Sequence, residues 1–266
     1  MTALRITPLF AFGSRRALRM VERNLLVYKH QWLGLLSGFF EPFFYLLSIG
    51  FGLGRLVGDV AGPGGQTIPY ALFVAPALLA ASSMNGAITE STFNFFFKLN
   101  YDKTFASILT TPMSAGDISL GELAWALMRG ALYSVGFLGV MVVFGLVRSP
   151  LVLLTLPGSL LIGFAFAAVG MAATSFMRTW QDFDLIQLVI LPMFLFSGTF
   201  FPLDAMPDGV RLLIQLTPLY HGVDLLRTLS VGVVGPDTLV HVVYLTVMGL
   251  LGLAVVSRRL DKLLLK

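Results

Sequence analysis

Apolar runs separated by short polar segments make up most of this chain. Each run is close to the ~20 apolar residues that a helix needs to cross a membrane. The pattern predicts an all-α polytopic membrane protein, a single domain over 1-266 with six transmembrane helices. The predicted spans lie at about 31-54, 69-90, 119-146, 151-176, 183-201 and 237-257.

Three further segments are too polar, or too broken by proline, to span a membrane. Residues 14-28 place aliphatic side chains on one helical face and arginines on another, which favours an amphipathic helix on the cytoplasmic membrane surface over a frayed basic tail. Residues 98-112 have an amphipathic centre and predict either an ordinary loop or a short helix that docks on a cytoplasmic partner. Residues 202-231 predict short, half-buried helices on the external side.

The composition supports a membrane protein. Charged residues make up 12% and hydrophobic residues 56% of the 266 residues, and the mean hydropathy is +0.85. Soluble domains carry about 25% charged residues, so this chain has too little charge to cover a soluble domain. The absence of cysteine excludes disulfides and cysteine-ligated metal centres. No short apolar segment with a cleavage site follows the basic residues 1-30, so we expect no removed signal peptide.

The basic residues divide unequally between the two sides of the predicted membrane. Lys and Arg concentrate in cytoplasmic segments of membrane proteins. Six spans place Arg129 inside the third span and four arginines in external loops, namely Arg55, Arg148, Arg211 and Arg227. The other thirteen basic residues are then cytoplasmic: Arg5, Arg15, Arg16, Arg19, Arg23, Lys29, Lys98, Lys103, Arg178, Arg258, Arg259, Lys262 and Lys266. This predicts an inner or plasma membrane protein with both termini cytoplasmic, whose net charge of +4 requires no nucleic-acid partner.

Motifs for bond chemistry are missing from the sequence. No Gly-Lys-Ser/Thr P-loop, His-Glu-x-x-His or Gly-x-Ser-x-Gly motif occurs. The three histidines, His30, His221 and His241, lie far apart in the chain. We therefore expect no catalytic site, no metal site and no cofactor bound by this chain.

A few charged residues interrupt the predicted spans. Glu41 lies in the first span beside Pro42, and a carboxyl group there should face protein or water. Glu122 and Arg129 lie two turns apart on one face of the third span. They have two interpretations: a polar network that couples the cytoplasmic side to a pore, or an interfacial carboxylate and an arginine with a structural partner.

Two segments resemble the ABC-2 type transporter permeases. The fifth predicted span ends in Ser197-Gly198-Thr199-Phe200-Phe201-Pro202, after which Pro218 is followed nine residues later by Arg227. Residues 116-126, Gly-Asp-Ile-Ser-Leu-Gly-Glu-Leu-Ala-Trp-Ala, are similar to the branch that includes nodulation-factor (lipo-oligosaccharide) export permeases. The resemblance covers nearly the whole chain.

The resemblance implies a permease subunit of an ATP-driven exporter. ATP and Mg would bind on a separate ABC ATP-binding subunit, present in two copies, and a second permease copy or a paralogue would complete the conduit among the membrane lipids. Segment 14-28 would be the interface helix, 98-112 the coupling helix and 202-231 the external re-entrant helices. The implied ATPase-subunit contacts are Arg19, Arg23, Tyr101, Asp102, Lys103, Thr104, Phe105 and Ser107. The conduit and gate candidates are Glu41, Glu122, Arg129, Phe200, Phe201, Pro202, Pro218 and Tyr220.

Two other functions are compatible with a polytopic membrane protein. An ion-coupled secondary transporter would use Glu41, Glu122 and Arg129 as proton or ion sites, but such folds usually contain internal repeats, and residues 31-146 show no convincing similarity to 151-257. A membrane enzyme or assembly factor without a transport role is the second alternative.

Overall fold

Helices form most of the part of the chain that the structure describes. The computed structural model describes residues 15–28 and 40–264. The described part of the first long helix covers Phe40–Val57. The remaining elements are α1 (Arg15–Tyr28), β1 (Asp59–Ala61), β2 (Thr67–Pro69), α4 (Tyr70–Thr89), α5 (Thr104–Ile108), α6 (Ala115–Val143), α7 (Thr155–Thr174), α8 (Asp182–Leu195), α9 (Asp208–Gln215), α10 (Pro218–Val231) and α11 (Pro236–Leu264).

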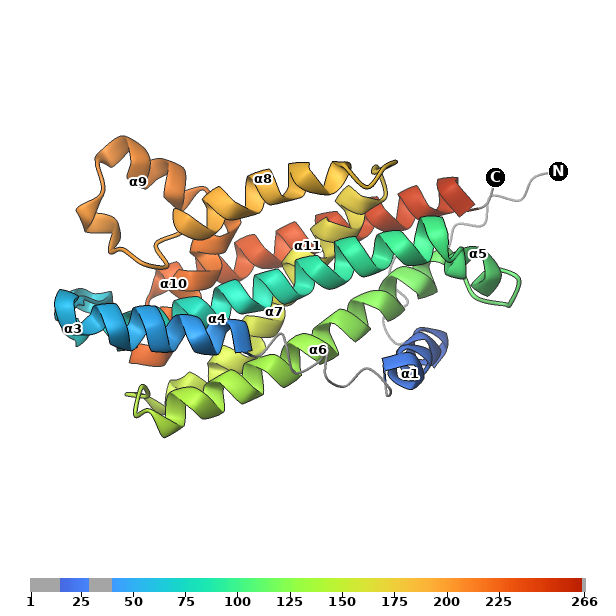
Figure 1. The fold of residues 1–266 in the computed structure, drawn as a ribbon. Coiled ribbons are helices and arrows are strands. Elements are labelled where there is room, and N and C mark those ends of the chain that lie inside the picture. Colours follow the sequence, from blue (N-terminus) through green and yellow to red (C-terminus); the bar gives the residue numbers. More distant parts are fainter. Residues whose placement is uncertain (1–14, 29–39, 265–266) are drawn as a thin grey trace.

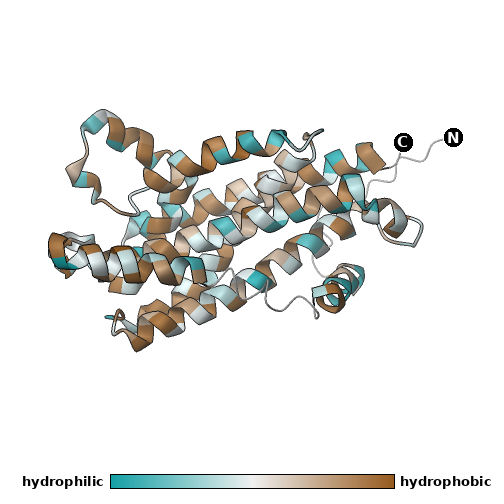
Figure 2. Ribbon diagram, in the orientation of Figure 1, coloured by the Kyte–Doolittle hydropathy of each residue, from teal (hydrophilic) through white to brown (hydrophobic). Residues whose placement is uncertain are grey.

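Five of the described helices are long and apolar enough to cross a membrane: Phe40–Val57, Tyr70–Tyr101, Ala115–Val143, Pro150–Thr174 and Pro236–Leu264. Figure 2 shows hydrophobic residues along most of the length of these helices. The residues predicted as the fifth span instead form α8, whose 14 residues extend only ~21 Å against a hydrocarbon core of about 30 Å. Figure 1 shows that α8 nonetheless runs beside the long helices and leads toward α9. Part of the predicted first span, 31-39, lies outside the described residues.

The second long helix extends further than its composition indicates. The predicted span ends at 90, but the helix continues through the π-helical turns Glu90–Asn94 and Phe97–Tyr101. It ends where Lys103 adopts a left-handed conformation (φ 48°). The predicted coupling helix 98-112 is therefore wrong in its extent, because 98–101 belong to the long helix and only α5 forms a separate short one.

The third long helix starts earlier than predicted because of its cap. Ser114 and Asp117 form a capping box, in which each side chain accepts a hydrogen bond from the backbone N–H of the other residue. A capping box satisfies amide groups that would lack a partner at a helix start. The helix therefore begins at Ala115 and not at the predicted residue 119.

The shorter helices and the ends of the long ones lie at two opposite ends of the bundle. Figure 1 shows α1, α5 and the C-terminal end of α11 at one end, and α3 (Gly54–Val57), α9 and α10 at the other. We refer to these as the α5 end and the α9 end. At the α9 end, β1 and β2 pair antiparallel, and a turn with the sequence Gly62-Pro63-Gly64-Gly65 connects them. The segments with most of the basic residues thus lie at the α5 end.

Close packing of α7 against α11 forms the centre of the bundle, with α4 and α10 beside them. Glycine allows this approach, because an added Cβ at Gly252 would lie 2.7 Å from the backbone of Ala168 and Val169. Small residues serve the same purpose in membrane helices generally, since helix association in lipid depends on close van der Waals contact.

We predict that Gly252→Ala lowers the stability of the bundle. The new methyl group would meet backbone atoms that cannot rotate away, and such overpacking typically costs ~1–3 kcal/mol. Thermal unfolding of the purified protein in detergent measures the effect. Gly130→Ala is the matched control on α6, because nothing lies within 4 Å of its added Cβ, and alanine favours a helix over glycine. Equal melting temperatures for the two variants would contradict the packing argument.

Candidate functional site

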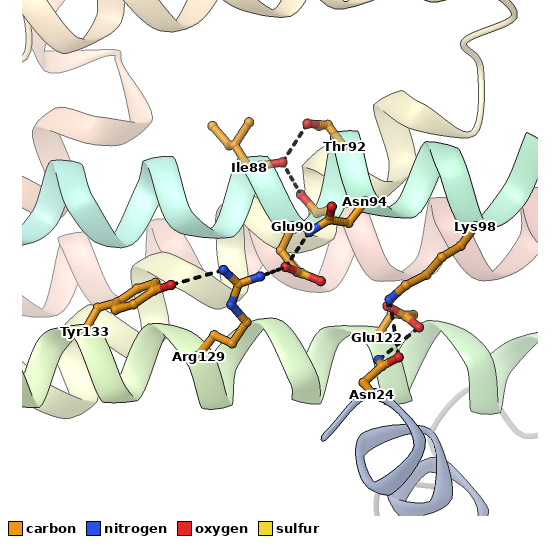
Figure 3. Close-up of polar contacts among 10 residues, drawn as sticks. Asn24, Ile88, Glu90, Thr92, Asn94, Lys98, Glu122, Arg129 and Tyr133 are labelled. Atoms are coloured by element: carbon orange, nitrogen blue, oxygen red, sulfur yellow. Dashed lines mark hydrogen bonds and ion pairs between the residues drawn. The ribbon is translucent and has the colours of Figure 1, made fainter. Parts of the chain in front are cut away.

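A buried ion pair joins the second and third long helices. Arg129 on α6 pairs with Glu90 on the π-helical turn that follows α4, and the carboxylate of Glu90 is 3% exposed (Figure 3). The guanidinium of Arg129 also donates to the Tyr133 hydroxyl at 3.1 Å, and the Asn94 amide donates to Glu90 at 2.8 Å. Because an unpaired charge is costly in a low-dielectric interior, each partner requires the other.

A second ion pair lies nearer the α5 end. Lys98 Nζ is 2.6 Å from the carboxylate of Glu122, which is also 3% exposed (Figure 3). Asn24 on α1 donates to Glu122 at 3.2 Å and accepts from Lys98 at 3.4 Å. The amphipathic helix is therefore attached to the charged groups between the two membrane helices.

The aromatic ring of Tyr28 provides another contact of α1 with this network. The Arg129 guanidinium lies 5.3 Å from the centre of the Tyr28 ring, and the same ring packs 5.1 Å from that of Trp125. Burial, reinforced by the nearby Glu90 carboxylate, raises the pKa of Tyr28 to about 12, so its phenol stays neutral at physiological pH. A neutral aromatic face attracts the cation through its quadrupole.

A partly open cavity of about 250 Å³, lined by charged and polar as well as apolar side chains, lies beside the Glu90–Arg129 pair, and we call it the polar cavity. Glu41 borders it from the first long helix, and Phe194 borders it from α8. Hydroxyl and amide groups from the middle of the second and third long helices supply the other polar atoms. The full lining is Glu41, Pro42, Tyr45, Leu78, Ala81, Ser82, Asn85, Gly86, Thr89, Arg129, Tyr133 and Phe194. The cavity thus combines anionic, cationic and neutral polar groups inside an apolar bundle.

Beyond the cavity, the second long helix carries a row of aromatic side chains toward the α5 end. Phe93 and Phe97 lie 5.1 Å apart, measured between ring centres, and each contacts the indole of Trp180. Phe97 stacks in turn on Tyr101 at 5.2 Å. Phe93, Trp180 and Tyr101 are all exposed. We call Phe93, Phe97, Tyr101 and Trp180 the aromatic surface.

Most of the predicted ATPase contacts are accessible on or near α5. Tyr101, Asp102, Lys103 and Ser107 are exposed, and Thr104 is half-buried. Phe105 is the exception, because its ring is 0% exposed and packs 5.0 Å from Phe95. Its predicted place on the partner surface is therefore wrong: it anchors α5 to the bundle.

The predicted contacts on α1 are less uniform. Arg19 is exposed and forms a 2.7 Å ion pair with Glu22. Arg23 is half-buried and donates to Asn24 at 3.1 Å, which connects it to the Lys98–Glu122 pair. One of the two arginines thus faces outward, while the other is continuous with the buried network.

The gate candidates lie together at the α9 end. The backbone carbonyl of Phe200 accepts a hydrogen bond from the Tyr70 hydroxyl at 3.1 Å, whereas Phe201 is exposed. Pro202 and Pro218 are half-buried, and Pro218 occupies the first turn of α10. Tyr220 is also half-buried, and burial raises its pKa to about 12.

Arg227, counted above among the arginines of the external loops, is buried within α10. The side chain is 3% exposed and donates to the backbone carbonyls of Phe73 at 3.1 Å and Gly198 at 2.7 Å. Its guanidinium also lies 3.7 Å from the centre of the Phe73 ring. Arg227 therefore holds α10 against α4 and against the Ser197-Gly198 turn.

Comparison with known proteins agrees with these features. The model of the ABC-2 type transporter family matches residues 16–230. The chain belongs to this family. It is 34% identical over 254 residues to Nodulation protein J of Rhizobium leguminosarum bv. trifolii, a match that covers 93% of this chain and 95% of the relative. It is also 34% identical over 223 residues to Nodulation protein J of Sinorhizobium fredii, covering 83% of each chain. The Azorhizobium caulinodans protein of the same name is 25% identical over 246 residues, covering 90% and 95%.

The sequence of this ABC-2 chain did contain a signal for the two ion-pair partners that were not predicted from it. Glu90 and Lys98 lie at the end of an otherwise apolar run, and charges inside a membrane helix are expected to face a partner. Glu122 and Arg129 were predicted on one face, either as a coupling network or as an interfacial carboxylate and an arginine with a structural partner. Each forms an ion pair with the second long helix and not with the other. Asn24 carried no comparable signal, because its place depends on how α1 docks.

We predict that the Glu90–Arg129 pair is strongly coupled energetically. Glu90→Gln or Arg129→Met alone leaves an uncompensated buried group and should cost about 3–5 kcal/mol. The double variant should be less destabilised than the sum of the two, as measured by unfolding in detergent and a double-mutant cycle. Glu22→Gln is the matched control, because its partner Arg19 is exposed and such pairs contribute about 1 kcal/mol or less. Additive losses would show that the two side chains do not interact.

Proposed function

We propose that this chain is the permease subunit of an ATP-driven ABC exporter. The observation that carries the proposal is the partly open polar cavity between the helices, together with its ion-paired connection to α1 at the α5 end. A stable pore wall or an anchor needs no charged cavity in an apolar interior, since such groups are costly there. A protein that moves polar groups across a membrane does need one.

The driving force would come from two ABC ATP-binding subunits that hold ATP and Mg. Their closure on ATP would press on α5 and the turn before it, where the exposed Asp102, Lys103 and Ser107 are available for contact. α5 follows the second long helix directly, and the buried ring of Phe105 ties it to the bundle. A push on α5 would therefore move the helix that carries Lys98 and Glu90, and with it the cavity.

The substrate that fits this chemistry is amphipathic, with a head group rich in hydroxyl or amide groups. Ser82, Asn85 and Thr89 offer hydrogen-bonding groups in the cavity, and the aromatic surface offers faces on which sugar rings can pack. Several relatives carry the name Nodulation protein J, and the sequence resembles nodulation-factor export permeases. We therefore propose a lipid-linked glycan of this kind, taken from the cytoplasm or the inner leaflet.

A second permease subunit would complete the conduit. α8 has no buried residue, and its exposed side chains Leu185, Leu188 and Val189 form an apolar face. Phe194, on the same helix, borders the polar cavity. A second copy or a paralogue packed near α8 would enclose the cavity between two subunits and shield it from lipid.

We also propose which end of the bundle faces the cytoplasm. The basic residues gathered on α1, just before α5 and at the end of α11 would place the α5 end in the cytoplasm. α8 and the following turn would complete a sixth crossing, so that both termini are cytoplasmic in the inner or plasma membrane. α9 and α10 would then be the external re-entrant helices.

Affinity purification from the native membrane tests the proposal directly. We expect the tagged chain to bring down an ABC ATP-binding subunit, and the complex to hydrolyse ATP. An ATPase carrying a Walker-lysine substitution should assemble with the chain but fail to drive export. A purified chain that transports its substrate without ATP, in response to an ion gradient, would refute the proposal in favour of a secondary transporter.

Asp102 and Lys103 belong to the segment that we propose to contact the ATPase, which we call the coupling segment. Reversing either charge should reduce the coupling of ATP hydrolysis to substrate without preventing assembly of the complex. Asp102→Lys and Lys103→Glu each change an exposed charge without touching the core, so membrane insertion should remain normal while substrate-stimulated ATPase activity falls severalfold. The assay is ATP hydrolysis by the reconstituted complex with and without substrate. Asp237→Lys is the matched control, because it reverses an exposed charge at the α9 end. Unchanged stimulation in both coupling variants would place the partner contact elsewhere.

A further inference from the structure

Two buried histidines meet between α10 and α11 at the α9 end. His221 Nδ1 and His241 Nδ1 lie 2.7 Å apart, and the other ring nitrogen of His241 lies 2.9 Å from a carboxylate oxygen of Asp224. The histidines are 8% and 4% exposed. The ring of His221 also stacks on Tyr244, with ring centres 3.9 Å apart. Neither the polar cavity nor the coupling segment uses this cluster.

At a separation of 2.7 Å, only one hydrogen fits between the two Nδ1 atoms. A hydrogen bond needs one nitrogen to donate and the other to accept. If His241 donates its Nε2–H to Asp224, its Nδ1 is free to accept the Nδ1–H of His221. When both rings are protonated on both of their nitrogens, two N–H groups and two positive rings meet at 2.7 Å, and the contact would have to open.

The surroundings of His221 contain few other titratable groups. α10 contributes Asp224, Tyr220 and the more distant Arg227, which is directed toward Phe73 and Gly198. α11 contributes His241 and Tyr244, whose hydroxyl donates to the carbonyl of Leu216 at 3.2 Å. α7 contains no titratable residue, and the only one on α4 is Tyr70, which is bonded to Phe200.

We propose that His221 and His241 form a proton-binding latch that holds α10 against α11, and that uptake of a second proton by the pair releases α10. The proposal rests on the proposed function in one respect, namely that this end of the bundle faces outward. The ligand is the proton of an acidic external medium, and the released element would be the proposed external gate.

The electrostatics of the site support the direction of the effect. Burial, and next the neighbouring His241, lower the pKa of His221 to about 4. If opening restores the ordinary value of 6.5, the closed state loses stability as the pH falls below about 6.5, and the loss is complete near pH 4. By this linkage the equilibrium shifts toward the open state about tenfold at pH 5.5 and about thirtyfold at pH 5.0.

Spin-label distances in the full chain test the latch without a substrate or an ATPase. The chain has no cysteine, so Leu213→Cys on α9 and Leu239→Cys on α11 provide two exposed label sites. In lipid nanodiscs, we expect a single closed distance at pH 7.5 and a second, longer one at pH 5.0. His221→Gln, which cannot take up the proton, should stay closed at both pH values.

The controls separate the latch from general acid effects and from the proposed function. Labels at Val169→Cys on α7 and Leu251→Cys on α11 should show no pH dependence. If His221→Gln does not fold, His241→Gln serves instead: it removes the neighbouring ring that lowers the pKa of His221, so the response to pH should shrink. An identical wild-type distance at both pH values, or an undiminished response in His221→Gln, would overturn the latch. Failure to isolate an ATPase partner would leave these distances unaffected.

Discussion

The pairing of buried charges between the second and third long helices is the constraint on which the rest of the structure depends. Glu90 and Arg129 form one pair, and Lys98 and Glu122 form the other, all within a bundle of apolar helices. Because a lone charge is so costly in that environment, the two helices have only one favourable register. The cavity exists beside Arg129 because this register brings polar groups of both helices to the same level.

The same pairs give the amphipathic helix a structural role inside the bundle. α1 reaches the network through Asn24 and Tyr28, so a helix expected only at the membrane surface is connected to groups that border the cavity. At the opposite end, Arg227 fixes the position of α10, because its side chain donates to the carbonyls of Phe73 and Gly198. Polar contacts thus secure the two peripheral helices, while apolar contacts such as those around Gly252 secure the centre.

Several features of the chain could be predicted from local rules. The long helices follow from apolar runs of sufficient length, the turn at Gly62-Pro63-Gly64-Gly65 follows from residue preferences, and the family follows from the motifs around Ser197 and Pro218. The end of the second helix could not be predicted in this way. Residues 98–101 look like loop by composition, yet they stay helical because Lys98 finds Glu122 on a neighbouring helix.

The sequence alone determined that this is a polytopic helical membrane protein of the ABC-2 type transporter family without the common motifs for bond chemistry, because composition, span length and motifs are local properties. The tertiary structure decided which charges are partners, that Phe105 and Arg227 face inward, and that His221 and His241 meet although twenty residues separate them. These outcomes depend on helix register and docking, which arise from packing between distant segments. Single-sequence patterns contain no record of that packing.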